Sequence, residues 1–575
     1  MSRGTFTFVL HSHLPWVLHH GRWPHGVDWL NEAAAETYLP LARVLHERAR
    51  EGRALGVTLG LTPVLCEQLA HPGFQREFVT YLDQKTAAAA EDRAWFTRSG
   101  EAALAELAAR WERFYRSSLE DFMGAQGPNL VQRFRRLEEK GAIEIITCGA
   151  THGYLPLLSS DVAAAGQLRT AVTAHRRHFG RAPRGIWLPE CAYRPAGPWR
   201  APQGSGAPEI ARRGIESLLA EHGLAYFFVD SHLLSGGSPL GVYADRFAAL
   251  HHLARDARGA TALAAHPPYR PYRVGREAGV ACFGRDPVTA MQVWSGEHGY
   301  PGDGAYLDFH KKRFPGGHRY WSVTHPRADL AHKQVYRPAE AEARAPAHAA
   351  HFVSLLERTL GEAARSQRVP PVICAMFDTE LFGHWWFEGP RFLGAVLDRC
   401  AEAGIDAHAA GAILERQPPD EAVALPEGSW GDGGGHQVWD NEATRWTWPL
   451  VHAAEARYAK AARDAAGRAG APGSDPLLER LLAQAGRELL LLESSDWQFL
   501  ITTFAARDYA ELRVTEHAED FARIAALAER RIEGGSLSEA DEQFLAECER
   551  RDALFPDFDW RGYAGRTRDA AVGAR

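Results

Sequence analysis

The chain has 575 residues, so two or three structural units are expected, because one hydrophobic core seldom supports a chain of this length. Its net charge of -7 lacks the basic excess that favours binding to nucleic acid or to an anionic membrane. The N-terminus has no apolar run of signal-peptide length, and no stretch approaches the roughly 20 apolar residues that span a bilayer. We therefore expect a cytoplasmic globular protein without nucleic-acid or membrane partners.

Cysteine and tryptophan are the most informative residue types. The seven cysteines stand singly, without a CxxC pair, which argues against a disulfide framework and against a cysteine zinc site. The 17 tryptophans are numerous, and many stand near Gly, His, Asp or Glu. An indole face stacks well on the C–H bonds of a pyranose ring, so some of them are candidate sugar-binding groups. Core packing is the alternative for each single ring.

Seven short apolar runs are predicted strands, and most lack the polar alternation of a half-exposed strand. They cover residues 5–10, 56–61, 142–147, 185–189, 224–229, 279–283 and 372–377. Continuous apolar runs are typical of parallel strands that are buried on both faces. Helical patterns lie between them, at 38–50, 162–179, 216–222 and 352–365. This alternation indicates an α/β fold, and about seven βα units favour a barrel over a small open sheet.

Polar side chains follow most of the predicted strands directly. They are His11, His13, Thr62, residues 148–152, Glu190, Asp230 and Asp378. The catalytic groups of a parallel barrel lie at the C-terminal ends of its strands. This regular placement therefore predicts an active site at one end of the barrel.

Four segments depart from the repeat. Residues 84–137 form too long a helical stretch for one crossover and indicate a helical insertion, and residues 231–285 are expected to form a long loop or small lobe over the barrel mouth. Residues 198–208 are expected to be a disordered surface loop. After about residue 416 the pattern is helical, with helices at 477–493 and 520–532 and a flexible link at 463–476.

Two motifs supply carboxylates at predicted strand ends. WLPECAY places Glu190 after a proline and between aromatic residues, and FDTELFGHWW places Asp378 before a turn that carries His384 and two tryptophans. Hydrolysis or transfer of a glycoside needs two carboxyl groups that flank the scissile bond. Glu190 and Asp378 are the natural pair for that chemistry.

The opening motif HSHLP allows a different interpretation, because metallohydrolases built on a barrel use a His-x-His pair to hold a catalytic metal. His11 and His13 would then need further ligands at other strand ends. His152 is the only additional histidine in a comparable position. The ligand set is incomplete, so we expect no metal and no cofactor, and a metal-dependent hydrolase is kept as the distant alternative.

The motifs WLPECAY, FDTELFGHWW, HSHLP and SSDWQF together resemble glycoside hydrolase family 57, and most closely its 1,4-α-glucan branching enzymes. The resemblance implies a (β/α)7 barrel over 1–83 and 138–415, with a helical insertion at 84–137. It also implies a helical C-terminal domain at 416–575 that contributes to the cleft. The implied reaction is retaining, with Glu190 as nucleophile, Asp378 as general acid/base and an α-glucan as substrate.

The same resemblance suggests which side chains bind the glucan. His11, His13 and His152 are expected to contact the sugar held on the nucleophile, and Asp496 is expected to close the cleft, with a helix N-cap or a surface charge as its alternative role. Aromatic or hydrogen-bonding contacts are expected from Trp29, Tyr243, Trp294, His384, Trp430, Trp439 and Trp497. Tyr243 follows a glycine-containing stretch and is a candidate for the tip of a mobile loop.

Alternatives remain open within this interpretation. A 4-α-glucanotransferase or an α-amylase of the same family would use the same two carboxylates, because only the incoming acceptor differs. A non-catalytic glucan-binding protein would keep the aromatic cleft without needing intact carboxylate motifs. The sequence does not indicate an oligomeric state.

Overall fold

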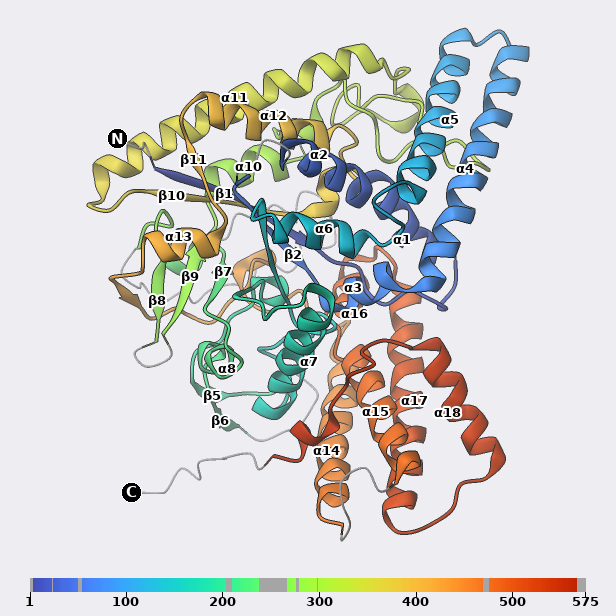
Figure 1. The fold of residues 1–575 in the computed structure, drawn as a ribbon, viewed down its shortest axis with the longest axis vertical. Coiled ribbons are helices and arrows are strands. Elements are labelled where there is room, and N and C mark those ends of the chain that lie inside the picture. The colour runs from blue at the N-terminus through green and yellow to red at the C-terminus, as the bar shows by residue number, and fades with distance from the viewer. Residues whose placement is uncertain are drawn as a thin grey trace.

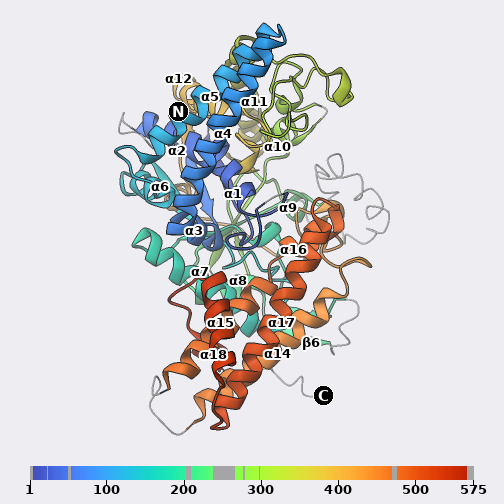
Figure 2. The same cartoon turned by 90° about the vertical axis from the view of Figure 1, so that its right-hand side faces the viewer.

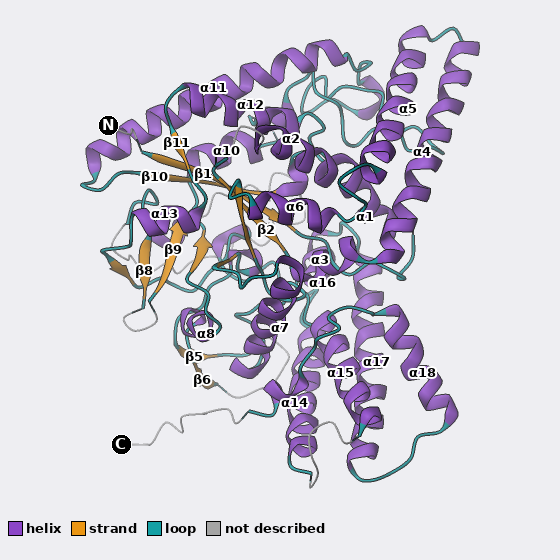
Figure 3. Cartoon of the chain, viewed as in Figure 1, coloured by secondary structure: helices purple, strands orange, loops and turns teal. Residues whose placement is uncertain are grey.

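The computed structural model describes residues 4–22, 24–49, 54–202, 209–236, 266–275, 279–296, 298–468 and 475–565. Strands gather in one part of the molecule with helices around them, as Figures 1 and 3 show. Among the helices in these ranges, none is long and apolar enough to cross a membrane.

Seven parallel strands form the centre of the fold. Four pair in the order β10-β1-β2-β3 and three in the order β9-β7-β4. Their bounds are Thr5–Ser12 (β1), Val57–Leu61 (β2), Ile143–Ile146 (β3), Gly185–Ile186 (β4), Tyr226–Val229 (β7), Val280–Gly284 (β9) and Val372–Asp378 (β10). Single parallel bridges join Thr147 to Ile186 and Arg285 to Cys374, which links the two sheets at both edges. The ring closes, and the predicted (β/α)7 barrel is confirmed.

All seven predicted strands are present because each run is buried on both faces. Strands β2 and β7 have no exposed residue, and β1 is buried except at its first position. Only β4 is much shorter than predicted. Pro189 has no N–H to donate, and Glu190 has a left-handed backbone, so strand pairing stops after Ile186.

Helices cover the outside of the barrel, and the remaining short strands lie at its margins. The helices are α1 (Val27–Ala33), η1 (Ala34–Tyr38), α2 (Leu39–Ala49), α3 (Pro63–Ala70), α6 (Leu130–Glu139), α7 (Asp161–Phe179), α8 (Ile215–Glu221), α9 (His232–Ser235), α10 (Pro287–Trp294), α11 (Pro338–Ser366), α12 (Gly389–Glu402) and α13 (Ala410–Arg416). The short strands are β5 (Gly197–Trp199), β6 (Ile210–Arg212), β8 (Tyr272–Val274), β11 (Asp406–Ala407) and β12 (Ala422–Val423).

Two helical parts lie at opposite ends of the long axis, as Figures 1 and 2 agree. At one end, α4 (Pro72–Arg98) and α5 (Ala102–Met123) form a hairpin. At the other end lie α14 (Thr447–Ala466), α15 (Pro476–Leu492), α16 (Asp496–Thr503), α17 (Arg507–Ile532) and α18 (Glu539–Arg551). A hydrophobic core shared by β4, β7, β9 and these C-terminal helices attaches them to the barrel.

Several expected segments differ in detail. The hairpin begins at Pro72, earlier than the start of the predicted insertion, and α11 extends well beyond 352–365. The expectation of a disordered loop over 198–208 is wrong at its start, because β5 pairs with β6 and the indole of Trp199 donates to the carbonyl of Pro156 over 2.8 Å. Residues 203–208 and most of the predicted lobe, 237–265, lie outside the described residues.

Candidate active site

The WLPECAY motif forms a strained turn at the end of β4. Glu190 has φ 59° and ψ 25°, and Cys191 has φ 48°, which are left-handed conformations that cost free energy in residues other than glycine. The Glu190 side chain is only 14% exposed. Such a backbone persists only when its surroundings enforce it, so the turn aims one carboxylate into an enclosed space.

Trp430 holds this carboxylate in place. Its indole N–H donates to Oε2 of Glu190 over 2.7 Å, and its backbone N–H donates to the carbonyl of Glu190 over 3.1 Å. The pKa of Glu190 is raised to about 8, chiefly by burial and also by the charges of Asp378 and Asp496, while the indole N–H of Trp430 opposes the rise. An indole can only donate, so this contact favours the ionised form of Glu190.

The second carboxylate motif reaches the same place because β10 pairs with β1. The parallel register sets His11 opposite Asp378. Next to this pair, the hydroxyl of Ser12 donates to Thr379 over 2.7 Å, and the backbone N–H of His13 donates to Glu380 over 3.1 Å. Burial, together with the charge of Asp378, raises the pKa of Glu380 to about 8. Glu190 and Glu380 therefore both have a pKa of about 8, and the charge of Asp378 contributes to both shifts.

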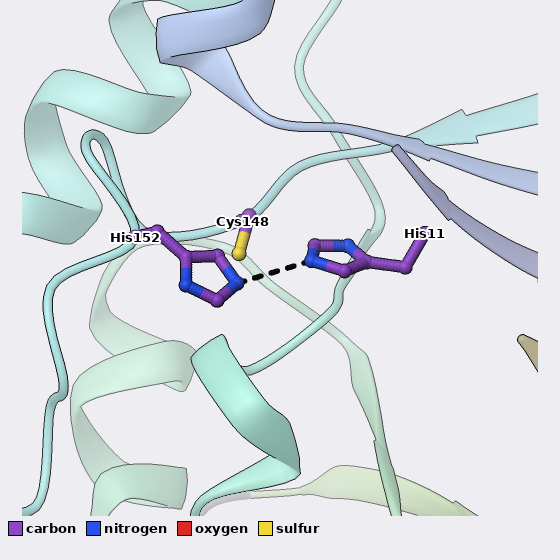
Figure 4. A group of neighbouring side chains, drawn as sticks. All are labelled: His11, Cys148 and His152. Carbon is purple, nitrogen blue, oxygen red and sulfur yellow. Dashed lines mark hydrogen bonds between the residues drawn. The ribbon is translucent and has the colours of Figure 1, made fainter. Parts of the chain in front are cut away.

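Three histidines stack beside these carboxyl groups. Nε2 of His11 lies 3.0 Å from Nε2 of His152, and the rings of His13 and His152 stack with centroids 4.0 Å apart. Figure 4 shows His11 and His152 facing each other, with Cys148 beside them. Burial and the neighbouring imidazoles hold the pKa of His11 and His152 well below the usual value. Both rings are therefore neutral, and they suit hydrogen bonding to uncharged hydroxyl groups.

The C-terminal helices contact the histidine cluster through Asp496. Its Oδ2 lies 2.9 Å from Nε2 of His13, and it accepts a 2.6 Å hydrogen bond from Ser494. Ser495 bonds Nδ1 of His152 over 2.7 Å. Burial would raise the pKa of Asp496, but His13, His152 and Ser494 hold it below the usual value. The side chain binds His13 and does not cap α16, which disagrees with the alternative role of a helix N-cap.

The donors in this cluster do not suit a resident metal. His11, Cys148 and His152 lie close enough to share an ion, as do His13, His152 and Asp496. Both nitrogens of His152 and of His13 already have hydrogen-bond partners, and burial raises the pKa of the Cys148 thiol well above its usual value. Cysteine binds a metal as the thiolate, which this environment disfavours, so the first group lacks its third ligand. A metal on the second group would have to displace the hydrogen bonds of His13 and His152.

Comparison with known proteins assigns this arrangement of barrel and cleft to a family. A family model described as glycosyl hydrolase family 57 matches residues 7–408. The chain belongs to glycosyl hydrolase family 57. A second model, described as the C-terminal part of 1,4-alpha-glucan branching enzyme, matches residues 451–563 and so includes Asp496. The two models together match most of the chain, residues 7–408 and 451–563.

Relatives extend this likeness over nearly the whole chain. It is 41% identical to a 1,4-alpha-glucan branching enzyme of Thermococcus kodakarensis, over 96% of this chain and 77% of the relative. It resembles the crystal structure of a family 57 branching enzyme from Pyrococcus horikoshii with a TM-score of 0.86 and 38% identity, covering 98% and 97% of the two chains. An α-amylase from Thermotoga maritima gives a TM-score of 0.79 and 28% identity, covering 99% and 100%.

The tryptophans expected to contact substrate lie in two different surroundings. Trp294 lies beside Trp430 with the ring centroids 6.1 Å apart, and its indole donates to the carbonyl of Met376, two residues before Asp378. Trp439 and Trp497 are 1% and 0% exposed in this conformation, and the expectation that they contact substrate stays a prediction. Neither ring offers a free face to a sugar.

The packing of these two rings explains their burial. Trp439 stacks on Tyr154 with the centroids 4.4 Å apart, and a Cβ on Gly431 would lie 2.6 Å from its ring. The absence of a side chain at Gly431 therefore leaves room for the indole of Trp439 in the core. Glycine-rich segments more often indicate exposed loops. Trp497 donates to the carbonyl of Leu491 and packs under Arg513.

Three further residues that were expected to contact substrate, His384, Trp29 and Tyr243, do not lie together. Nδ1 of His384 lies 3.4 Å from Oε2 of Glu36, which is ion-paired with Arg319, and this contact lies apart from Glu190. Trp29 is half-buried and packs against both hydrophobic cores. Tyr243 lies outside the described residues.

Sequence reasoning missed two residues that support the cleft. The hydroxyl of Tyr38, at the end of η1, donates to Glu380, although the two residues are 342 positions apart along the chain. Arg285 follows β9 directly and lies 3.4 Å from the buried Asp230, with its guanidinium over the ring of Trp430. The rule that functional side chains follow the C-terminal ends of barrel strands, here called the strand-end rule, would have identified Arg285. No local sequence pattern marks Tyr38.

Proposed function

We propose that the chain is a 1,4-α-glucan branching enzyme that cleaves an α-1,4 bond and transfers the glucan to a 6-hydroxyl. The observation that carries this proposal is the 2.9 Å contact between His13 and Asp496. It joins the barrel to a C-terminal region that resembles that of branching enzymes. The whole-chain likeness to branching enzymes is closer than that to the amylase, at 41% and 38% against 28% identity.

The proposed mechanism is a double displacement. Asp378 gives its proton to the glycosidic oxygen while the Glu190 carboxylate bonds to the anomeric carbon and the glycosidic C–O bond breaks. Asp378 then takes the proton of the incoming 6-hydroxyl, whose oxygen displaces Glu190. Two inversions retain the α configuration. Trp430 favours the required state by donating to ionised Glu190.

The histidines beside Glu190 are proposed to orient the glucosyl unit held on it. Nδ1 of His11 has no hydrogen-bond partner among the described residues and would bond a hydroxyl group directly. A sugar hydroxyl would replace Thr62 or Asp496 as a partner of His13, and Ser495 positions His152. Trp294 is proposed to support the acceptor chain, which competes with water for the intermediate. The expectation of a cytoplasmic location stays a prediction.

Amylose treated with the protein is expected to gain α-1,6 linkages, because the second displacement uses a 6-hydroxyl. The measurement is to digest the product with isoamylase and size the released chains, with untreated amylose as the control. Formation of new linear chains without branches would identify a 4-α-glucanotransferase. Net reducing ends without branches would identify an amylase.

Trp430→Phe is expected to lower kcat/KM about ten- to a hundredfold, since it removes a hydrogen bond to a charged group. The rate should fall as pH rises through about 8, where the carboxyl pair loses its last proton. Loss of the indole N–H raises the pKa of Glu190. The pH at which kcat/KM falls on the alkaline side should therefore be higher in the variant. The measurement is kcat/KM against pH on amylose.

The matched control is Trp294→Phe, which removes an indole N–H that donates to the carbonyl of Met376 instead of to Glu190. Its alkaline limb should stay at the wild-type pH. An unshifted limb in Trp430→Phe would contradict the role given to this indole.

Excess chelator is expected to leave branching unchanged, because hydrogen bonds already occupy the ring nitrogens of His13 and His152. The measurement is the initial rate on amylose after dialysis against EDTA, together with elemental analysis of the dialysed protein. Loss of rate that a divalent ion restores would favour the metal-dependent alternative.

A further inference from the structure

The helical hairpin and the barrel enclose a cavity of about 450 Å³ whose lining includes none of Glu190, Asp378, Asp496 and the three stacked histidines. Its walls come from α5, from α2, from the start of α12 and from the segments around Leu307 and Tyr336. This volume lies in the range of sites for small molecules. The exposed residues Arg113 and Ser117 also line it, so the cavity opens to solvent.

Three aromatic rings form one wall. Trp111 and Phe114 project from α5, and Phe387 comes from the segment before α12. The ring centroids lie 5.1 Å apart for Trp111 and Phe387 and 5.4 Å apart for Phe114 and Phe387. The Trp111 indole donates to the carbonyl of Arg319 over 2.7 Å, which fixes its orientation. Phe114 and Phe387 are only half-buried and therefore leave apolar surface for a ligand.

A buried carboxyl group with an unused oxygen also lines the cavity. Glu388 is 5% exposed, and its Oε1 accepts hydrogen bonds from the hydroxyl of Tyr336 over 2.6 Å and from the N–H of Leu307 over 3.2 Å. Its Oε2 has no hydrogen-bond partner. A buried polar atom without a partner is costly and points to a donor that the ligand supplies.

The charges of the lining select against an ionic ligand. Glu342 lies 2.9 Å from Arg110 and 3.7 Å from Arg391, so it neutralises part of the rim. The lining has equal numbers of positive and negative side chains: Arg110, Arg113, Arg391, Glu36, Glu342 and Glu388. A phosphate would meet three carboxylates, whereas a neutral molecule with hydroxyl groups meets donors, acceptors and aromatic faces.

We propose that this cavity is a second α-glucan site, which binds a short segment of the polymer between the α4–α5 hairpin and the barrel. Glucosyl rings stack on Phe114 and Phe387, and a hydroxyl group donates to Glu388. The inference rests on the proposed function for the class of ligand. It gives the hairpin a role, since a chain held there stays near the enzyme between transfers.

The test uses the full-length protein carrying Glu190→Gln, so that bound glucan is not consumed. Titration calorimetry with maltoheptaose is expected to detect two sites, one in the cleft and one in the cavity. Adding Phe114→Ala should weaken the second site about tenfold or more, because an aromatic side chain is lost. The matched control is Trp95→Ala on α4, an indole that is 42% exposed and does not line the cavity.

A second variant guards against damage to the fold. Ser117→Arg places a long side chain at an exposed position of α5 on the rim, and it should also abolish the second site. A single site that neither variant changes would overturn the inference, as would binding of an apolar dye in the cavity without binding of maltoheptaose. Branching by the wild-type protein, assayed by debranching, tests the proposed function separately.

Discussion

Replacing Glu190 by Gln is expected to lower the rate of amylose cleavage by about 10⁴-fold or more, because no carboxylate then attacks the anomeric carbon. The amide retains an acceptor oxygen for the indole of Trp430, so the cleft should keep its shape. Maltoheptaose should bind this variant within about threefold of the wild-type affinity, since the lost interaction belongs to the transition state. Initial rates and calorimetry measure the two effects.

The matched control for this loss is Glu144→Gln. Glu144 is also a largely buried glutamate with a raised pKa, but it lies on β3 and accepts from the N–H of Gly411 over 2.7 Å, outside the cleft. Its rate should stay within about threefold of wild type. Undiminished cleavage by Glu190→Gln would contradict the assignment of the nucleophile.

The left-handed backbone of Glu190 allows a stereochemical test. Glycine adopts φ 59° without strain, so Glu190→Gly removes the carboxylate, opens space and relieves the turn. Azide can then attack an activated 4-nitrophenyl α-maltooligoside directly. One displacement inverts the centre, so we expect a β-glycosyl azide, which NMR identifies. An α-glycosyl azide from this variant would assign the nucleophile to another residue.

The barrel strands were predictable because their burial on both faces leaves a continuous apolar pattern. The strand-end rule also placed His11, Glu190 and Asp378 at one end of the barrel, and the parallel register of β1 and β10 shows why two distant motifs meet. The left-handed turn at Glu190 was not predictable, since residues other than glycine adopt it only when tertiary contacts enforce it.

The contacts of individual tryptophans could not be read from the sequence. Trp430 and Trp439 stand in the same glycine-rich stretch, yet one bonds Glu190 and the other packs on Tyr154 in the core. A missing Cβ at Gly431 gives the indole of Trp439 room, which only the folded arrangement reveals. Contacts such as Tyr38 to Glu380 likewise depend on long-range packing that leaves no local pattern.

Replacing Asp378 by Asn is expected to lower the rate on amylose about 10²- to 10⁴-fold, because a sugar alkoxide is a poor leaving group without a proton donor. A 4-nitrophenyl donor leaves without protonation, so the same variant should still form the glycosyl-enzyme on Glu190. We therefore expect a burst of 4-nitrophenol followed by slow turnover, since no base activates the acceptor hydroxyl. Stopped-flow absorbance measures the burst, and Glu190→Gln, which lacks the nucleophile, should show none.

Azide separates the two carboxylates decisively when it is added to Asp378→Ala. As an anion it needs no base, so it should attack the intermediate on Glu190 and restore turnover of the activated donor. Two successive inversions give an α-glycosyl azide, opposite to the β product expected from Glu190→Gly. A β-glycosyl azide from Asp378→Ala would mean that the covalent intermediate never formed, and the roles of the two residues would have to be exchanged.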